Sequence, residues 1–171
     1  MDDLKRHIRE VPDWPKPGIL FYDITTLLKD PLALRMTVDR FVWLFSDQRV
    51  DKVVGMESRG FMFGPIVAYD LNAGFVPVRK PGKLPAETVE QSYALEYGTD
   101  KLQVHRDAIV PGEKVLIVDD LVATGGTARA TAQLIEGLGG QVVGMGFIIE
   151  LTFLKPRERL SDHRLESLIQ Y

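Results

Sequence analysis

Hydrophobic positions follow two different spacings along this chain, and the spacing predicts which segments are helices and which are strands. Leu34, Val38 and Phe41 recur at the intervals of a helix that buries one face. Asp30 is placed to cap such a helix, and Pro31 is tolerated at its first position. The pattern therefore predicts an amphipathic helix that begins at Pro31.

Beyond this helix, short runs of branched residues alternate with helical stretches. The predicted strands are residues 52–56, 75–79, 114–119 and 141–149, and the predicted helices are residues 61–71 and 127–138. A hairpin is predicted from residues 91–97 and 101–104, after an exposed, mobile loop over residues 80–90. Near-continuous apolar strands are typical of a parallel sheet covered on both faces. The fold class is therefore α/β, with a central, mainly parallel sheet flanked by helices.

Length and composition limit the possible functions. The chain has 171 residues, of which 45% are hydrophobic, and this size fits a single domain over residues 1–171. Cysteine is absent, which excludes disulfides, thiolate zinc sites and a cysteine nucleophile. The tail after Leu151 mixes charge with leucine and is expected to pack on the domain.

Charge gives no sign of a nucleic-acid or membrane partner. Lys and Arg number 21 against 24 Asp and Glu, so the net charge is −3 and nucleic acid is not attracted overall. The first ten residues are charged throughout, and the longest stretch without Asp, Glu, Lys or Arg covers only residues 137–149. We expect a cytoplasmic protein that binds neither membranes nor nucleic acid.

The segment VLIVDDLVATGGTA, residues 115–128, carries the clearest chemistry. An apolar strand delivers the carboxylates of Asp119 and Asp120 to a loop that ends in two glycines and opens a helix. Ligands of open α/β sheets bind beyond the carboxyl ends of the strands. Loop residues 123–127 can turn backbone N–H groups toward a phosphate, with the positive end of the helix behind them.

An acidic pair beside a phosphate site would repel the phosphate unless it binds something else. Ribose hydroxyls or a magnesium ion are fitting partners for the two carboxylates. The segment matches neither GxxxxGK[ST] nor GxGxxG, so the common nucleotide-binding loops do not explain it. It predicts a site for a sugar phosphate.

This segment resembles the signature of the type I phosphoribosyltransferases, which bind 5-phosphoribosyl 1-diphosphate. The likeness extends to the branch of that family that acts on adenine, and it covers nearly the whole chain. The matching segments are PGILFYDIT at residues 17–25, ESRGFMFGP at 57–65, VRKPGKLP at 78–85 and SYALEYG at 92–98. Several linked motifs in register are far more specific than one.

The resemblance implies transfer of the 5-phosphoribosyl group to adenine, giving AMP and diphosphate in purine salvage. It implies Mg²⁺ held mainly through substrate oxygens rather than by a protein cage. It also implies a homodimer, in which Arg79 or Lys83 reaches the neighbouring subunit's site, and a type I phosphoribosyltransferase-like fold with a small N-terminal and hood region. Within this fold, a cis peptide is expected between Glu57 and Ser58.

The resemblance also assigns roles to individual residues. For the ribose 5-phosphate, they are Asp119, Asp120, Ala123, Thr124, Gly125, Gly126 and Thr127. For the diphosphate, they are Ser58, Arg59, Gly60, Arg79, Lys80 and Lys83. The implied catalytic residues are Arg59 and Glu96, and Glu96 would handle the purine ring proton under a hood that closes over the reacting centre.

The base is expected beside Leu20, Phe21 and Tyr22, where an aromatic or apolar wall would stack the purine. Many members of the family carry Arg at the position of Tyr22, and a tyrosine cannot donate the same charge-assisted hydrogen bonds. Two alternatives therefore stay open: another purine base (xanthine, hypoxanthine or guanine), or a regulator that binds the donor without turning it over. Such a regulator would not need Arg59, the lysines of the loop and Glu96 together.

Overall fold

The computed structural model describes residues 2–94 and 99–171, and its centre is a five-stranded parallel sheet. The strand order is β4-β3-β7-β8-β9. The strands are β3 (Lys52–Met56), β4 (Gly74–Val78), β7 (Lys114–Val122), β8 (Gln141–Glu150) and β9 (Leu165–Gln170). The chain moves outward in one direction from β3 to β4 and in the other from β7 to β9, so the order reverses between β3 and β7. Such a reversal is where open α/β sheets bind ligands.

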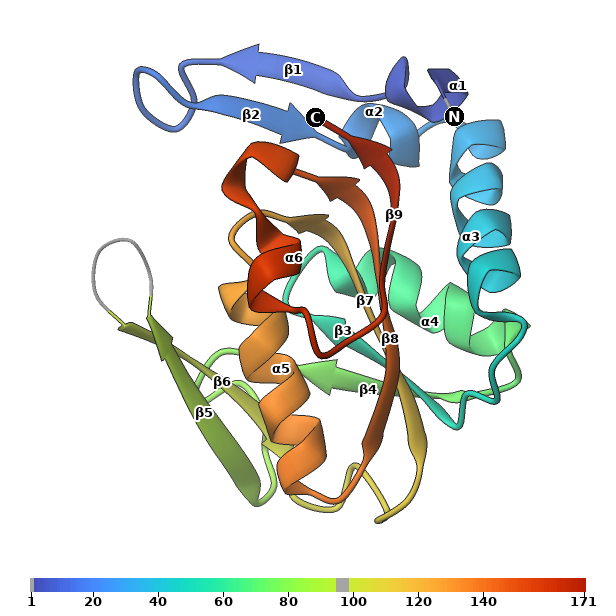
Figure 1. Ribbon diagram of the computed structural model, residues 1–171, viewed down its shortest axis with the longest axis vertical. Coiled ribbons are helices and arrows are strands. Elements are labelled where there is room, and N and C mark those ends of the chain that lie inside the picture. Colours follow the sequence, from blue (N-terminus) through green and yellow to red (C-terminus); the bar gives the residue numbers. More distant parts are fainter. Residues whose placement is uncertain (1, 95–98) are drawn as a thin grey trace.

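Helices cover both faces of this sheet, as predicted (Figure 1). On one face lie α3 (Pro31–Phe45) and α4 (Gly60–Asp70), and on the other lies α5 (Gly126–Gly137). Successive residues of the strands serve opposite faces, because side chains alternate along a strand. Val53 packs in the core with α3 and α4, whereas Val54 packs in the core with α5. The predicted α/β class is confirmed.

The predicted start of α3 is confirmed in detail. The Asp30 carboxylate accepts hydrogen bonds from the backbone N–H groups of Leu32 and Ala33, both at 2.9 Å. Pro31 occupies the first turn, where its missing N–H is not needed. These caps stabilise a helix whose inward face, including Phe41 and Phe45, is fully buried.

Two antiparallel ribbons extend from the central layer. One pairs β1 (Arg9–Pro12) with β2 (Leu20–Asp23), and the other pairs β5 (Thr88–Ala94) with β6 (Thr99–His105). The β1–β2 ribbon crosses the top of the view in Figure 1, and the β5–β6 ribbon projects at the lower left. The second ribbon confirms the predicted hairpin, but β5 begins at Thr88, so the predicted loop over residues 80–90 was too long. Short helices complete the chain: α1 (Asp2–Lys5), α2 (Thr25–Leu28), α6 (Pro156–Arg159) and the 3-10 turn η1 (Thr152–Leu154).

Two strands differ from their predicted extents. β7 continues to Val122 rather than ending at Asp119, because residues beyond Asp119 still pair with β8. The C-terminal segment does more than pack on the domain, since β9 pairs in parallel with β8 and forms the edge of the sheet. Within the described residues, no helix is both long enough and apolar enough to cross a membrane.

Candidate active site

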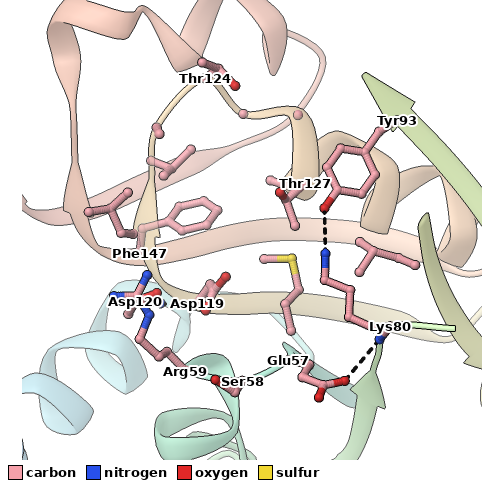
Figure 2. A pocket seen from close by; sticks show the side chains of 18 residues that line it. Glu57, Ser58, Arg59, Lys80, Tyr93, Asp119, Asp120, Thr124, Thr127 and Phe147 are labelled. Atoms are coloured by element: carbon pink, nitrogen blue, oxygen red, sulfur yellow. Dashed lines mark hydrogen bonds and ion pairs between the residues drawn. The ribbon is translucent and has the colours of Figure 1, made fainter. Parts of the chain in front are cut away.

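A cavity of about 280 Å³ opens at the reversal of strand order, beside the carboxyl ends of β3 and β7 (Figure 2). β3 pairs with β7 only as far as Val118, so the last residues of β7 extend past their neighbour and border this space. The lining residues are Met56, Glu57, Ser58, Arg59, Lys80, Tyr93, Leu102, Asp119, Asp120, Leu121, Val122, Ala123, Thr124, Gly125, Gly126, Thr127, Ala128 and Phe147. The structure thus brings together all seven residues expected at the ribose 5-phosphate and three of the six expected at the diphosphate.

The loop between β7 and α5 has the geometry of an anion-binding turn. Gly125 precedes the helix with φ +80°, a left-handed conformation that glycine adopts without strain. The first N–H groups of a helix have no acceptor within it, and Gly125 has no side chain to cap them. Because residues 123–128 line the cavity, these donors and the positive end of the helix are available to an anion there.

The two carboxylates of β7 differ in their surroundings. The Asp119 carboxylate accepts a hydrogen bond from the backbone N–H of Asp120 at 2.9 Å. Asp120 is 2% exposed and forms an ion pair with Arg59, with 2.9 Å between Nη1 and Oδ2. Burial raises the pKa of Asp119 well above its ordinary value, and the neighbouring Asp120 charge adds to this. Burial also raises the pKa of Asp120, although the Arg59 charge opposes it. The pair is therefore poised to bind a partner that supplies protons or positive charge.

Arg59 and Ser58 reach the cavity from the turn between β3 and α4, and the peptide between Glu57 and Ser58 is cis, as the resemblance implied. Gly60 does not line the cavity but has a steric role, because a Cβ there would lie 2.8 Å from the Val118 carbonyl oxygen and 3.1 Å from Asp119 Oδ1. Only glycine lets the start of α4 approach the acidic strand this closely.

Of the three basic residues at the end of β4, one reaches the cavity. Lys80 lines it, whereas the Arg79 guanidinium bonds to the Glu57 carboxylate at 3.2 Å and to the Lys83 carbonyl at 3.1 Å. This contact with Arg79 holds the pKa of Glu57 below its ordinary value. The Lys83 side chain lies on the exposed loop away from the cavity. Within this chain, neither Arg79 nor Lys83 lines the cavity, and their expected contact with diphosphate, in this subunit or a neighbouring one, stays a prediction.

The residues expected at the base are divided between the surface and the core. Phe21 packs edge-on against Trp14, with ring centroids 4.3 Å apart, and lies 5.4 Å from the Arg59 guanidinium. Leu20 is 43% exposed, and neither side chain lines the cavity. The Tyr22 side chain is 7% exposed and packs on the Tyr171 ring, with ring centroids 4.0 Å apart. This packing places the Tyr22 side chain in the core, and its expected contact with the base stays a prediction.

Several lining residues were not predicted. Glu57, Tyr93 and Phe147 come from three different strands or their ends, and only the folded sheet brings them to one cavity. The proposed catalytic residue Glu96 lies outside the described residues.

The donor set fits a metal ion that takes most of its ligands from elsewhere. Among residues 2–94 and 99–171, no three His, Cys, Asp or Glu side chains are grouped so as to hold a metal ion. Asp119 and Asp120 are the carboxylates that border the cavity beside the loop. Magnesium commonly binds through one or two carboxylates together with substrate phosphates and water, so these two residues fit it.

Known proteins match this chain over nearly its whole length. The family model for the phosphoribosyl transferase domain matches residues 25–165. The adenine phosphoribosyltransferase of Solibacter usitatus is 62% identical over 171 residues, covering 100% of this chain and 99% of that protein. That of Koribacter versatilis is 58% identical over 170 residues, covering 99% of this chain and 93% of that protein.

Solved structures agree with the sequence matches. Adenine phosphoribosyltransferase from Thermoanaerobacter pseudethanolicus has a TM-score of 0.97 and 50% identity, covering 99% of both chains. The Saccharomyces cerevisiae enzyme, in complex with an imino-altritol bisphosphate and adenine, has a TM-score of 0.93 and 40% identity, covering 98% of this chain and 97% of that one. The chain therefore belongs to the phosphoribosyl transferase family and, within it, to the adenine phosphoribosyltransferases.

Proposed function

We propose that the cavity at the carboxyl ends of β3 and β7 is the place where this enzyme joins its two substrates. The enzyme transfers the 5-phosphoribosyl group from 5-phosphoribosyl 1-diphosphate to adenine, giving AMP and diphosphate in purine salvage. One observation carries the placement: the loop over residues 123–127 and the pair Asp119–Asp120 border one cavity. This combination suits a ribose that carries a 5-phosphate.

In this arrangement, the protein groups stabilise charge as the bond to the leaving group breaks. A ring nitrogen of adenine forms the new bond to C1 of the ribose, and diphosphate departs with the electron pair of the old bond. The backbone N–H groups of the loop hold the 5-phosphate, and the two carboxylates accept hydrogen bonds from the ribose hydroxyls. Arg59 and Lys80 place positive charge where negative charge grows on the diphosphate. Glu96 accepts the ring proton that adenine loses.

A magnesium ion is part of this proposal. When bound, it would act as a Lewis acid on diphosphate and ribose oxygens. Asp119 and Asp120 would hold it together with those oxygens, and this contact would relieve the repulsion between the two buried carboxylates.

The reaction can be tested with a panel of bases. The protein is incubated with magnesium, the diphosphate donor and one purine base at a time, and the nucleotide formed is measured with and without a chelator. We expect AMP from adenine, little product from hypoxanthine, guanine or xanthine, and loss of product with the chelator. Preference for another base, or binding of the donor without turnover, would contradict the proposal.

We also propose that two copies of the chain associate through α4. Met62, Ile66 and Tyr69 lie at helical spacing on its outer face and are 42%, 40% and 84% exposed. Such an apolar stripe is typical of a surface that a protein partner covers. The helix begins directly after Arg59, so an interface on α4 would help to hold Arg59 in place at the cavity.

A cytoplasmic location stays a prediction from composition.

Light scattering after gel filtration tests the association. Tyr69→Asp should convert the dimer into a monomer, because it places a charge within the apolar stripe. Val110→Asp is the matched control, since Val110 is 61% exposed but belongs to the turn before β7. A wild-type monomer, or a dimer that survives Tyr69→Asp, would contradict this interface.

A further inference from the structure

Lys80 reaches the cavity from the end of β4, where its ammonium group meets the Tyr93 hydroxyl (Figure 2). A second residue of the β5–β6 ribbon, Asp100, also holds this ammonium group. Its Nζ lies 3.4 Å from the Tyr93 hydroxyl oxygen and forms an ion pair with the Asp100 carboxylate. The Tyr93 hydroxyl donates to the same carboxylate at 3.2 Å. The three side chains therefore form a closed triangle of polar contacts.

The triangle has one member outside the cavity. Tyr93 and Asp100 are directly opposite partners in the ribbon, and Lys80 and Tyr93 line the cavity whereas Asp100 does not. Asp100 thus holds the ammonium from outside. An ammonium has three protons, so the contacts with Asp100 and Tyr93 leave one for a ligand in the cavity.

Contacts at both ends restrict Lys80. Its backbone N–H donates to the Glu57 carboxylate at 3.1 Å, which fixes the base of the side chain. The four-carbon stem is otherwise free to rotate.

Burial lowers the pKa of Lys80, but its contacts with Asp100 and Tyr93 outweigh this and raise the pKa overall. The Lys80 contact lowers the pKa of Asp100, so both groups carry charge at neutral pH.

We propose that Asp100 is a positioning residue for the transfer reaction: through its contact with Lys80, it aims the ammonium at the leaving diphosphate. The proposal rests on the proposed function, because it requires Lys80 to bind diphosphate. It also makes the β5–β6 ribbon part of the diphosphate site, although the ribbon's Asp100 does not reach the cavity. A second ion pair on the same ribbon provides a comparison, since Glu90 and Lys101 lie 2.6 Å apart and neither lines the cavity.

Calorimetric titration with inorganic diphosphate and magnesium tests this role without requiring turnover. Asp100→Asn should raise the Kd for diphosphate about tenfold, the order expected when one charge-assisted contact is lost. It should raise the KM for the donor similarly and leave the KM for adenine unchanged. Asp100→Glu should restore part of the affinity. Glu90→Gln, the matched control on the same ribbon, should bind diphosphate like the wild type.

A double-mutant cycle separates positioning from a structural effect. If Asp100 acts through Lys80, adding Asp100→Asn to Lys80→Ala should weaken diphosphate binding no further. Additive losses, equal losses in Glu90→Gln, or unchanged or tighter binding in Asp100→Asn would overturn the inference. If Lys80→Ala alone binds diphosphate like the wild type, the proposed role of Lys80 fails as well. If Lys80→Ala weakens binding and Asp100→Asn does not, the inference about Asp100 alone fails.

Discussion

The cavity is assembled from two kinds of structure, the central sheet and the two-stranded ribbons. The sheet side comprises the ends of β3 and β7 with the starts of α4 and α5, and it carries the acidic pair and the anion-binding turn. The ribbon side consists of β5–β6, which carries Tyr93 at the cavity wall. The β1–β2 ribbon does not line the cavity, but its Phe21 ring lies 5.4 Å from the Arg59 guanidinium. β7 is hydrogen-bonded to a strand on each side, whereas each ribbon has only two strands.

This difference indicates different roles for the sheet side and the ribbons. Electrostatic stabilisation depends on groups that are already in place, and under the proposed function the buried sheet side provides them for the sugar phosphate. Two-stranded ribbons are only marginally stable alone, so they suit contacts that form and break in each catalytic cycle. We therefore expect changes on the sheet side to alter folding stability and affinity for the 5-phosphoribosyl part of the donor, whereas changes of exposed or cavity-facing groups on the ribbons should alter turnover, base binding or the contact with diphosphate.

The largest effect is expected at Glu96, which stands between β5 and β6 in the sequence. Glu96→Gln should lower kcat about 10²- to 10⁴-fold, because it removes the group proposed to take the ring proton. Steady-state kinetics measures this, and urea unfolding should show the same stability as the wild type. Glu87→Gln on the adjoining loop, where Glu87 pairs with Arg106, is the control. Unchanged turnover would reject the acid–base role.

The next largest effect is expected at the acidic pair. The double variant Asp119→Asn, Asp120→Asn should raise the KM for the donor about 100-fold, because both carboxylates that accept ribose hydroxyl protons are lost. The KM for adenine should change far less. Kinetics with each substrate varied in turn separates the two values. A loss confined to adenine would mean that the ribose lies elsewhere.

The buried Asp119 carboxylate should also lower the free energy of unfolding at neutral pH, because burial disfavours its charged form. Its pKa is raised in the folded protein, so between the ordinary value of 3.8 and the raised one the folded state binds more protons than the unfolded state. Stability from this group is present below pH 3.8 and is lost as the pH rises through the folded pKa. Relative to the wild type, Asp119→Asn should therefore gain stability as the pH rises over this window. Urea unfolding of both proteins at a series of pH values from the ordinary value of 3.8 upward measures the gain, and a constant difference would contradict it.

The comparison also explains how much of the fold could be predicted from the sequence. The cap of α3 and the turn before α5 depend on neighbouring residues, and both were predicted close to their observed places. β9 and the β1–β2 ribbon were missed. β9 exists because Leu165–Gln170 pairs with β8, and β1 exists because Arg9–Pro12 pairs with residues about ten positions away. Their local patterns are too short to show this.

The site divides in the same way. Residues 119–127 form one continuous segment, so the order of the acidic pair, the glycine loop and the helix start already indicated an anion and a sugar in the sequence. Glu57, Tyr93 and Asp100 act together with Lys80 only after β4, β5 and β6 have met, which no local pattern shows. Tyr22 was placed at the base because aromatic residues serve both cores and ligands, and its packing partner, Tyr171, is the last residue of the chain.

A smaller effect is expected at the β1–β2 ribbon. Trp14→Leu should raise the KM for adenine about fivefold, because Phe21 loses the aromatic edge that orients it. The KM for the donor should not change. The chain has two tryptophans, so Trp43→Phe leaves Trp14 as the only one. Trp43 is 75% exposed on α3, and its variant is the kinetic control. In that variant, adenine should alter the fluorescence; a constant signal would place the base away from this ribbon.

The smallest effect is expected at Thr127, at the start of α5. Thr127→Val keeps the shape of the side chain and removes one hydroxyl donor, while the backbone N–H groups of the turn remain. Phosphate binding should therefore weaken only about threefold, as measured by titration with ribose 5-phosphate.

Thr131→Val on the same helix is the matched control for Thr127→Val. The Thr131 hydroxyl is buried and donates a hydrogen bond to the Thr127 carbonyl at 2.9 Å rather than facing the cavity. Its loss should therefore lower the free energy of unfolding and leave the affinity for ribose 5-phosphate unchanged. A neutral result for Thr127→Val would mean that the backbone alone holds the phosphate. A loss of 100-fold would mean that the hydroxyl, rather than the turn, dominates. In that case, the sheet side would depend on single side chains as much as the ribbons do, and the proposed division between a fixed anion site and movable ribbons would fail.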